Sequence, residues 1–184
     1  GIKAAFASAS SQLTTIWYDG ERLLFQHSLP EPARGISRHL LDATLASQFL
    51  ALGGDLLCGE RCTHDEEGTV WASGRVKQNG GWIGLKAHFD GLPITADLEI
   101  HLANHGYVGL TQIENKRVNV SGLFKRSATL SPSAADASAL IVAIREAGLP
   151  NLARRLQSST LIKDSLKGVT HFSLGWQMSS DDRL

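Results

Sequence analysis

The sequence predicts an α+β fold in which one antiparallel sheet is flanked by helices. Between about residues 82 and 124, apolar and polar residues alternate in four segments separated by turn-forming residues, which is typical of a four-stranded meander. Apolar residues at helical spacing occur on either side of it, at about 37–52 and 132–147. Because a sheet of this size must be covered on at least one face, we expect these helices to pack against it.

The N-terminal part predicts a hairpin followed by a rigid connection. Residues 12–18 and 22–27 have the pattern of strands, and Asp19-Gly20 between them is a hairpin turn signal. The sequence Leu-Pro-Glu-Pro follows at 29–32. It predicts a stiff connector, because each proline fixes its own φ and restricts the residue before it.

The first helix is predicted to begin after Ser37, a favourable N-cap residue, and to end at Gly53-Gly54. Apolar residues recur within it at spacings of four, four and three, and we expect them to form one buried stripe. These residues are Leu41, Leu45, Phe49 and Leu52. Short strands are predicted after this helix, at 55–58 and 69–72.

The four segments of the predicted meander are WIGLKAHF, DLEIHL, HGYVGLTQI and RVNVSGLF. In the last segment, every second residue from Val118 to Phe124 falls on one face. In DLEIHL, the three apolar residues oppose Glu99 and His101 in the same way. The alternation therefore predicts two chemically different faces for this sheet.

The C-terminal part predicts two more helices and a strand. Ser131-Pro132 combines an N-cap with proline at the first helical position, and this helix is expected to end at 148–150. Asn151 is predicted to cap a short second helix that reaches about Gln157. A final strand is predicted at 169–178.

Composition excludes several classes of function. The chain has 184 residues, enough for one domain, so we expect residues 1–184 to form a single unit. Its 18 basic and 18 acidic residues balance, which gives no indication of a nucleic-acid partner. The longest apolar run, 139–144, is far shorter than the roughly 20 residues of a membrane-spanning helix, so no transmembrane segment is predicted.

The two cysteines, Cys58 and Cys62, are predicted to be reduced. On a continuous strand their Cα atoms would lie roughly 13 Å apart, too far for a disulfide. Reduced thiols are typical of a cytosolic protein, so a cytoplasmic location is expected.

Histidines and a lysine are the residues that suggest chemistry. His88, His101 and His105 lie in or beside the meander, and three histidines could bind zinc, although none has a tight ligand spacing. Lys86, His88 and Asp90 share one strand face, where they would either line a polar pocket or face solvent. The sequence contains no GxSxG, P-loop or GxGxxG motif.

Three groups of segments together resemble the FAD-dependent oxidoreductases that include para-hydroxybenzoate hydroxylase and the geranylgeranyl reductase-like enzymes. The sequence GISRHLLD at 35–42 resembles the GxSRxxLD stretch of this group, and VWASGR at 70–75 resembles the strand and turn with its A-[DS]-G-R motif. The segments at 82–89, 106–110 and 117–124 resemble its substrate-domain sheet. The resemblance covers most of the chain.

The resemblance implies FAD as the cofactor and assigns candidate site residues. Arg38 would contact FAD near its ribityl or pyrophosphate side, with Ser73, Gly74 and Arg75 near the same ligand. An arginine at a helix start gains nothing from the helix dipole, which favours an anionic partner for Arg38. The candidates for substrate binding lie on the sheet: Lys86, His88, Tyr107 and Asn119.

Departures from the family pattern predict an incomplete flavoenzyme. No GxGxxG phosphate loop precedes Gln12, and the GD motif of the family is missing after Asp182. We therefore expect the chain to correspond to the substrate-binding domain plus part of the FAD-domain edge, inactive alone and unable to retain FAD by itself. Its partners would be the missing FAD-binding portion and a small-molecule substrate. The alternative is a self-sufficient α+β domain that binds a small ligand without redox chemistry.

Overall fold

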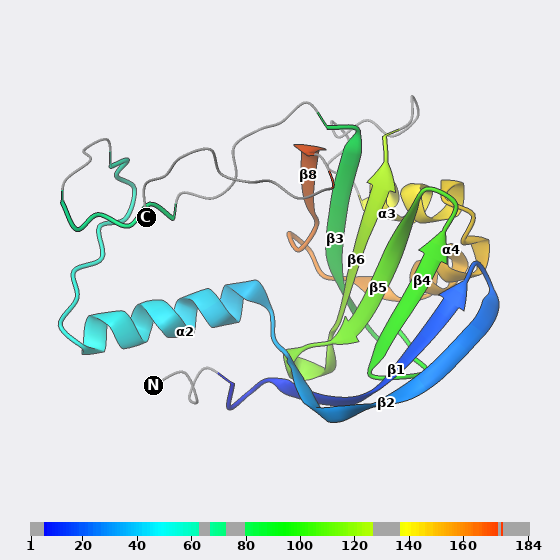
Figure 1. Cartoon of the computed structure of the whole chain (residues 1–184), viewed down its shortest axis with the longest axis horizontal. Helices are drawn as coiled ribbons and strands as arrows, with labels where there is room; N and C mark the ends of the chain where they lie inside the picture. Colours follow the sequence, from blue (N-terminus) through cyan, green and yellow to red (C-terminus); the bar gives the residue numbers. More distant parts are fainter. Residues whose placement is uncertain (1–5, 63–66, 73–79, 127–136, 173, 175–184) are drawn as a thin grey trace.

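The computed structural model describes residues 6–62, 67–72, 80–126, 137–172 and 174. In these ranges the chain forms one eight-stranded, mostly antiparallel sheet together with helices, which confirms the α+β class (Figure 1). The strands are β1 (Ser10–Asp19), β2 (Arg22–Gly35), β3 (Trp82–Asp90), β4 (Leu98–Ala103), β5 (Gly106–Gln112), β6 (Val118–Lys125), β7 (Thr160–Leu161) and β8 (Lys167–Phe172). The helices are α2 (Arg38–Ala51), α3 (Ala137–Glu146), α4 (Pro150–Gln157) and the short 3-10 helix η1 (Glu114–Lys116).

The strand order differs from a simple meander. The order is β2-β1-β4-β5-β6-β3-β7, and β8 also pairs with β3. Strands β4, β5 and β6 are consecutive antiparallel neighbours as predicted, but β3 pairs with β6 and not with β4. The predicted turn at 90–93 is part of a longer connection, 91–97, which places β5 and β6 between the two strands that it joins. A connection of this length no longer requires its strands to be hairpin neighbours.

The N-terminal hairpin is confirmed, and it extends the sheet at its edge. β1 pairs antiparallel with β2 and parallel with β4. The predicted connector at 29–32 lies inside β2, where the register shifts between Gln12 and Thr14. Residues 29–32 therefore bulge from the ladder, and an edge strand tolerates prolines there because they need not donate to a neighbour.

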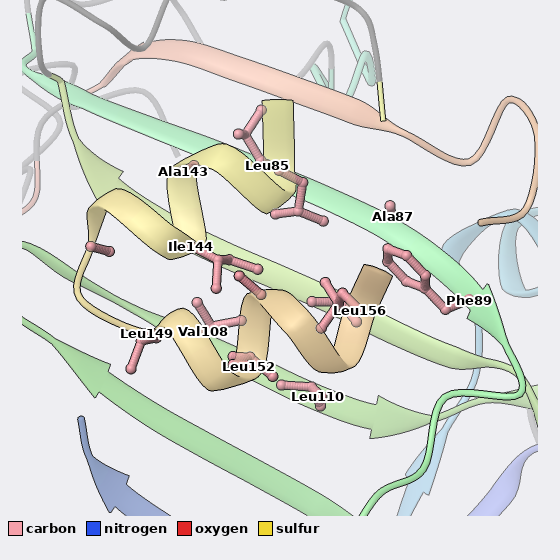
Figure 2. Packing of buried hydrophobic residues seen from close by; sticks show 14 of the residues in the cluster. Leu85, Ala87, Phe89, Val108, Leu110, Ala143, Ile144, Leu149, Leu152 and Leu156 are labelled. Atoms are coloured by element: carbon pink, nitrogen blue, oxygen red, sulfur yellow. The ribbon is translucent and has the colours of Figure 1, made fainter. Parts of the chain in front are cut away.

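One face of the sheet carries the hydrophobic core. Helices α3 and α4 pack against β3, β5 and β6, as Figure 2 shows for Leu85, Phe89, Leu110, Ile144 and Leu156. The predicted alternation in β6 is confirmed, since Val118, Val120, Gly122 and Phe124 are all buried. Each large side chain that is fully buried here contributes about 1.5–3 kcal/mol.

In β4 the buried face is the polar one. Glu99 and His101 are buried toward the helices, whereas Leu98 and Ile100 are half-buried on the opposite face and Leu102 is exposed. The alternation in β4 was predicted, but its apolar residues do not belong to the core.

Helix α2 extends away from the sheet (Figure 1). Its predicted N-cap is confirmed, because the Leu40 amide donates to Ser37 Oγ at 3.2 Å. The prediction of a buried stripe is wrong: none of its residues is buried, and Phe49 remains 49% exposed. Residues 55–58 and 69–72 are likewise not strands, since they pair with no strand of the sheet.

The C-terminal elements differ from the prediction at their starts. The predicted start at Ser131-Pro132 lies outside the described residues, and α3 is described from Ala137 onward. Helix α4 begins at Pro150 with Leu149 in the cap position, so the prediction of an Asn151 cap is wrong. Proline fits this first position because it has no N–H that needs a helical partner. β8 covers Lys167–Phe172 and therefore includes the first part of the strand predicted at 169–178. Of the remaining predicted residues, only 174 lies in the described ranges.

Candidate functional site

A cavity of about 400 Å³ opens on the face of the sheet opposite α3 and α4, near the point where β2 ends and α2 begins. We call this the open-face cavity. Its walls come from β1, β2, the start of α2 and strands β3 to β6. Its lining residues are Gln12, Arg34, Gly35, Ile36, Ser37, Arg38, Lys86, His88, Leu98, Thr111, Ile113 and Asn119.

The sheet register explains why polar side chains gather in this cavity. His88 of β3 pairs directly with Asn119 of β6, and Asn119 pairs with Thr111 of β5. Paired residues project to the same face, so these three side chains form a row across the sheet. Lys86 lies on the same face, two residues before His88. We call Lys86, His88 and Asn119 the open-face cluster.

The junction between β2 and α2 forms another wall. A side chain at Gly35 would collide with the carbonyl oxygen of Gln112 and with the Gln12 amide, so only glycine fits this close approach. The Ser37 amide donates to Glu114 Oε2 at 2.8 Å, which joins the start of α2 to η1. Burial raises the pKa of Glu114, but the hydrogen bonds from Ser37 outweigh it, and the pKa lies below its ordinary value.

Lys86 and His88 determine the electrostatics of the cluster. Lys86 Nζ lies 3.4 Å from His88 Nε2. Burial and the neighbouring Lys86 ammonium lower the pKa of His88 below its ordinary value. Because an ammonium group can only donate, Nε2 is the acceptor in this contact and His88 is neutral. The pair therefore carries a single positive charge, on Lys86.

Arg38 fits a flavin cofactor only in part. Its Nε donates to both carboxylate oxygens of Asp42, at 2.7 and 2.9 Å, and its side chain is 80% exposed. The remaining guanidinium nitrogens are thus accessible to an anion. The amide of Ser37, however, is already bound by Glu114, so the start of α2 has lost one donor that a pyrophosphate would need. Within the ranges that the structure describes, the residues could contact one edge of FAD but do not form a complete phosphate cradle.

The structure brings together four of the predicted site residues: Arg38, Lys86, His88 and Asn119. Tyr107 is on the same face of the sheet, but it lies outside the cavity and is exposed. The predicted cofactor residues at 73–75 lie outside the described ranges. Asp90 forms an ion pair with Arg117 at 3.4 Å and does not line the cavity.

The sequence did not predict the other lining residues of the open-face cavity, most of which come from segments far from Lys86 and His88 in the chain. The lining residues that were not predicted are Gln12, Arg34, Gly35, Ile36, Ser37, Leu98, Thr111 and Ile113. Thr111 could have been found from the alternation in β5 once its register with Asn119 was known. Arg34 and Gln12 had no comparable local signal.

The opposite face contains a second polar group, which we call the buried cluster: Glu99, His101 and Arg155. Glu99 is fully buried and accepts hydrogen bonds from Arg155 Nη2 at 2.5 Å and from His101 Nε2 at 3.1 Å. The Thr95 amide also donates to Glu99. Burial raises the pKa of Glu99, but these hydrogen bonds outweigh it and lower the pKa to about 2. Tyr18 stacks on His101 beside a smaller cavity of about 270 Å³.

The histidines do not form a metal site. His88 lines the open-face cavity and His101 faces α4 on the other side of the sheet, so the three-histidine hypothesis is wrong. In the described ranges no three potential metal ligands among His, Cys, Asp and Glu come together. The cysteines, Cys58 and Cys62, form no disulfide, as predicted. None of the helices that the structure describes is long and apolar enough to span a membrane.

Comparisons with known proteins reveal similarity in structure alone. No family model matches the chain, and no curated protein matches it in sequence. HpxO from Klebsiella pneumoniae, solved as a variant in complex with FAD, superposes with a TM-score of 0.65 over 90% of this chain and 54% of its own, at 12% identity. The flavin-dependent brominase Bmp2 gives a TM-score of 0.65 over 89% of this chain and 51% of its own, at 12% identity.

The myxobacterial chondrochloren halogenase CndH, described as FAD-dependent, gives a TM-score of 0.61 over 93% of this chain and 51% of its own, at 13% identity. The fold is one that flavin-dependent enzymes contain. This finding confirms the predicted resemblance at the level of the fold. The chain spans about half the length of these proteins.

Proposed function

We propose that this chain is the substrate-binding portion of an FAD-dependent oxidoreductase of the monooxygenase or reductase type, and that it is inactive without a flavin-binding portion. The observation that carries the proposal is the open-face cavity, which Arg38, Lys86, His88 and Asn119 all line. A concave site with a few convergent polar groups and apolar walls is the usual form of a small-molecule site. The fold shared with FAD-dependent enzymes supports flavin as the redox partner.

Helix α2 supports the presence of a further portion. Leu45, Phe49 and Leu50 are all substantially exposed on this helix, which has no buried residue. Exposed apolar side chains gathered on one element are typical of a contact surface. In this proposal these side chains dock against the flavin-binding portion. Separately, we propose that the protein is cytoplasmic.

FAD would supply the redox chemistry, and the residues of this chain would bind and orient the substrate. Lys86 and Asn119 offer hydrogen-bond donors, and neutral His88 can exchange a proton with a bound hydroxyl. Arg38, with nitrogens left over from its pair with Asp42, would contact the edge of the cofactor.

The alternative is a self-sufficient domain that binds a small ligand without redox chemistry. The observation in its favour is the core between the sheet and helices α3 and α4, which is closed without any contribution from α2. Such a core would allow this part of the chain to fold alone. Both functions use the open-face cavity, so they differ only in the need for flavin.

A flavin titration separates these functions. The purified chain, and the same chain joined to the flavin-binding portion of its parent, would be titrated with FAD while flavin fluorescence and thermal stability are followed. We expect saturable binding with a raised melting temperature only for the longer protein. Saturable binding by the chain alone would contradict its dependence on a flavin-binding portion. A longer protein that binds no flavin would favour the ligand-binding domain.

A further inference from the structure

We propose that the open-face cavity binds a small molecule through an oxyanion, either a carboxylate or an ionised hydroxyl, and that Lys86 is the residue that recognises this group. The inference rests on the proposed function, because it names the class of substrate that the same site takes. Its test needs no flavin and no turnover.

The charges around the cavity are unbalanced. Its ionisable lining residues are Arg34, Arg38, Lys86 and His88, and none of its lining residues is a carboxylate. Arg38 has Asp42 as its partner, but neither Arg34 nor Lys86 has a carboxylate within ion-pair distance in the part of the chain that the structure describes. A half-buried ammonium without a counter-ion attracts an anion more strongly than an exposed one, because water screens it less.

The nearby carboxylate of Glu114 does not neutralise Lys86. Glu114 accepts a hydrogen bond from the Ser37 amide and is therefore held at the start of α2. At His88, the charge of Lys86 acts more strongly than the opposing charge of Glu114. No ion pair joins Glu114 to Lys86 in the described ranges, so the charge of Lys86 is not balanced there.

The arrangement of donors suits an oxyanion. Lys86 uses one of its three N–H donors on His88 Nε2, which leaves two for a ligand. Lys86 and His88 are two residues apart on β3, and Asn119 is the direct partner of His88 on β6. An oxygen that approaches Lys86 thus meets one cationic donor and two neutral polar side chains, and charge-assisted hydrogen bonds of this kind are about twice as strong as neutral ones.

The size and walls of the cavity define the rest of the ligand. About 400 Å³ suffices for a single-ring or short branched molecule. Half-buried Ile36 and Leu98 provide apolar surface in the same cavity, and Leu98 continues the polar row because it pairs with Thr111. The ligand class is therefore a compact apolar body with one oxyanion.

The oxyanion could belong to a substrate or to the pyrophosphate of a flavin, and the location of Lys86 favours a substrate. Lys86 lies on β3 within the sheet, beside His88 and one strand from Asn119, whereas Arg38 lies at the start of α2 with its side chain mostly exposed. A pyrophosphate would be expected at the exposed cations. A substrate inside the cavity would instead lie over the sheet, where Lys86 is located.

The test compares benzoate with benzamide, which has the same ring without the charge. Both would be titrated into the isotopically labelled chain, and backbone amide shifts would be followed by NMR. We expect benzoate to bind roughly tenfold more tightly than benzamide, with shifts at Lys86, His88 and Asn119 and with affinity that falls as salt is raised. Inorganic pyrophosphate is a third probe, and we expect it to leave these amides unchanged.

Lys125 offers a matched control. It lies on the same face of β6, four residues beyond the partner of Lys86 and roughly 13 Å from it, and it does not line the cavity. We expect Lys86→Met to abolish the preference for benzoate and Lys125→Met to retain it. Both variants should keep the native spectrum, since neither lysine has a carboxylate partner to lose.

Equal affinities for benzoate and benzamide would overturn the proposal, and so would a preference that survives Lys86→Met. Pyrophosphate that displaces benzoate from Lys86 would assign the site to a cofactor phosphate instead of a substrate. These outcomes are independent of the flavin titration: a protein that prefers benzoate through Lys86 but never binds flavin would retain this inference and refute the redox function.

Discussion

Two polar clusters lie on opposite faces of the same sheet, and each contains a histidine and a cation. In the buried cluster, Glu99 is surrounded by donors and balances the charge of Arg155. In the open-face cluster, Lys86 has a neutral histidine as its neighbour and no carboxylate. The ion pair of Glu99 and Arg155 is satisfied within the chain and contributes to the fold. The ammonium group of Lys86 has no such partner in the described ranges and can bind an anionic ligand. The comparison therefore indicates a structural role for the buried cluster, and it supports the binding role that we propose for the open-face cluster.

The largest effect is expected from Glu99→Gln. This substitution leaves Arg155, which is only 23% exposed, without its counter-ion, and breaking a buried pair costs about 3 kcal/mol. Urea unfolding would measure the loss. Asp42→Asn is the control, because it removes an exposed pair with Arg38 and should cost less than about 1 kcal/mol. Equal losses in the two variants would contradict the structural role of the buried cluster.

Acid should destabilise the protein through the same carboxylate. The pKa of Glu99 is about 2 in the folded state and near 4.5 when the chain is unfolded, so the unfolded state binds more protons between these values. Stability is then fully present above pH 4.5 and falls as the pH drops toward 2. Melting temperatures between pH 5 and pH 2.5 should fall less steeply for Glu99→Gln. A slope unchanged by this substitution would assign the acid sensitivity to other carboxylates, among them Asp97 and Glu114.

Ser37→Ala extends the comparison to the helices. Loss of the N-cap costs about 1 kcal/mol, and α2 has no buried residue to compensate for it. We expect reduced helical ellipticity with little change in the midpoint of global unfolding, because the core lies under α3 and α4. Ser47→Ala, within the same helix, should have a smaller effect. A large shift of the global midpoint would mean that α2 is part of the cooperative core.

The smallest effect is a pH dependence from His88. Its pKa is lowered in the folded state, so the unfolded chain binds the additional proton as the pH falls below about 6.5. Stability should therefore decline from pH 6.5 downward until the folded-state pKa is reached. His88→Gln should remove this contribution, and the same change at the exposed His105 serves as the control. If the two variants lose the same slope, the open-face cluster is not the source.

The sequence predicted the elements whose patterns reflect local structure. The alternation in β6 was informative because its apolar side chains meet the core directly. In β4 the same kind of pattern did not indicate the buried face, because Glu99 is stabilised by Arg155, 56 residues further along the chain. For α2 the apolar stripe was present, but the pattern contains no information about what covers it.

The candidate site was predictable to the extent that it lies within neighbouring strands. Period-two spacing placed Lys86 and His88 on one face, and the family resemblance added Arg38 and Asn119. The cavity itself depends on contacts across the chain, such as the Gln12 side chain that donates to the carbonyl of Gln112, 100 residues away. Such long-range contacts leave no periodic signal in the sequence.

The parallel ladder between β1 and β4 has a consequence for the folding pathway. The β1–β2 hairpin is local, but the Asp97 carboxylate that receives the amides of Leu13 and Thr14 lies about 83 residues away from them. Closing so long a loop costs conformational entropy before the contacts between β1 and β4 can form. The β1–β2 hairpin should therefore form early and pair with β4 late. Pulsed hydrogen exchange during refolding should show these two amides protected after those of β5 and β6, and earlier protection would contradict this order. The hydrogen bonds from Leu13 and Thr14 to Asp97 would then form in the last step of sheet assembly.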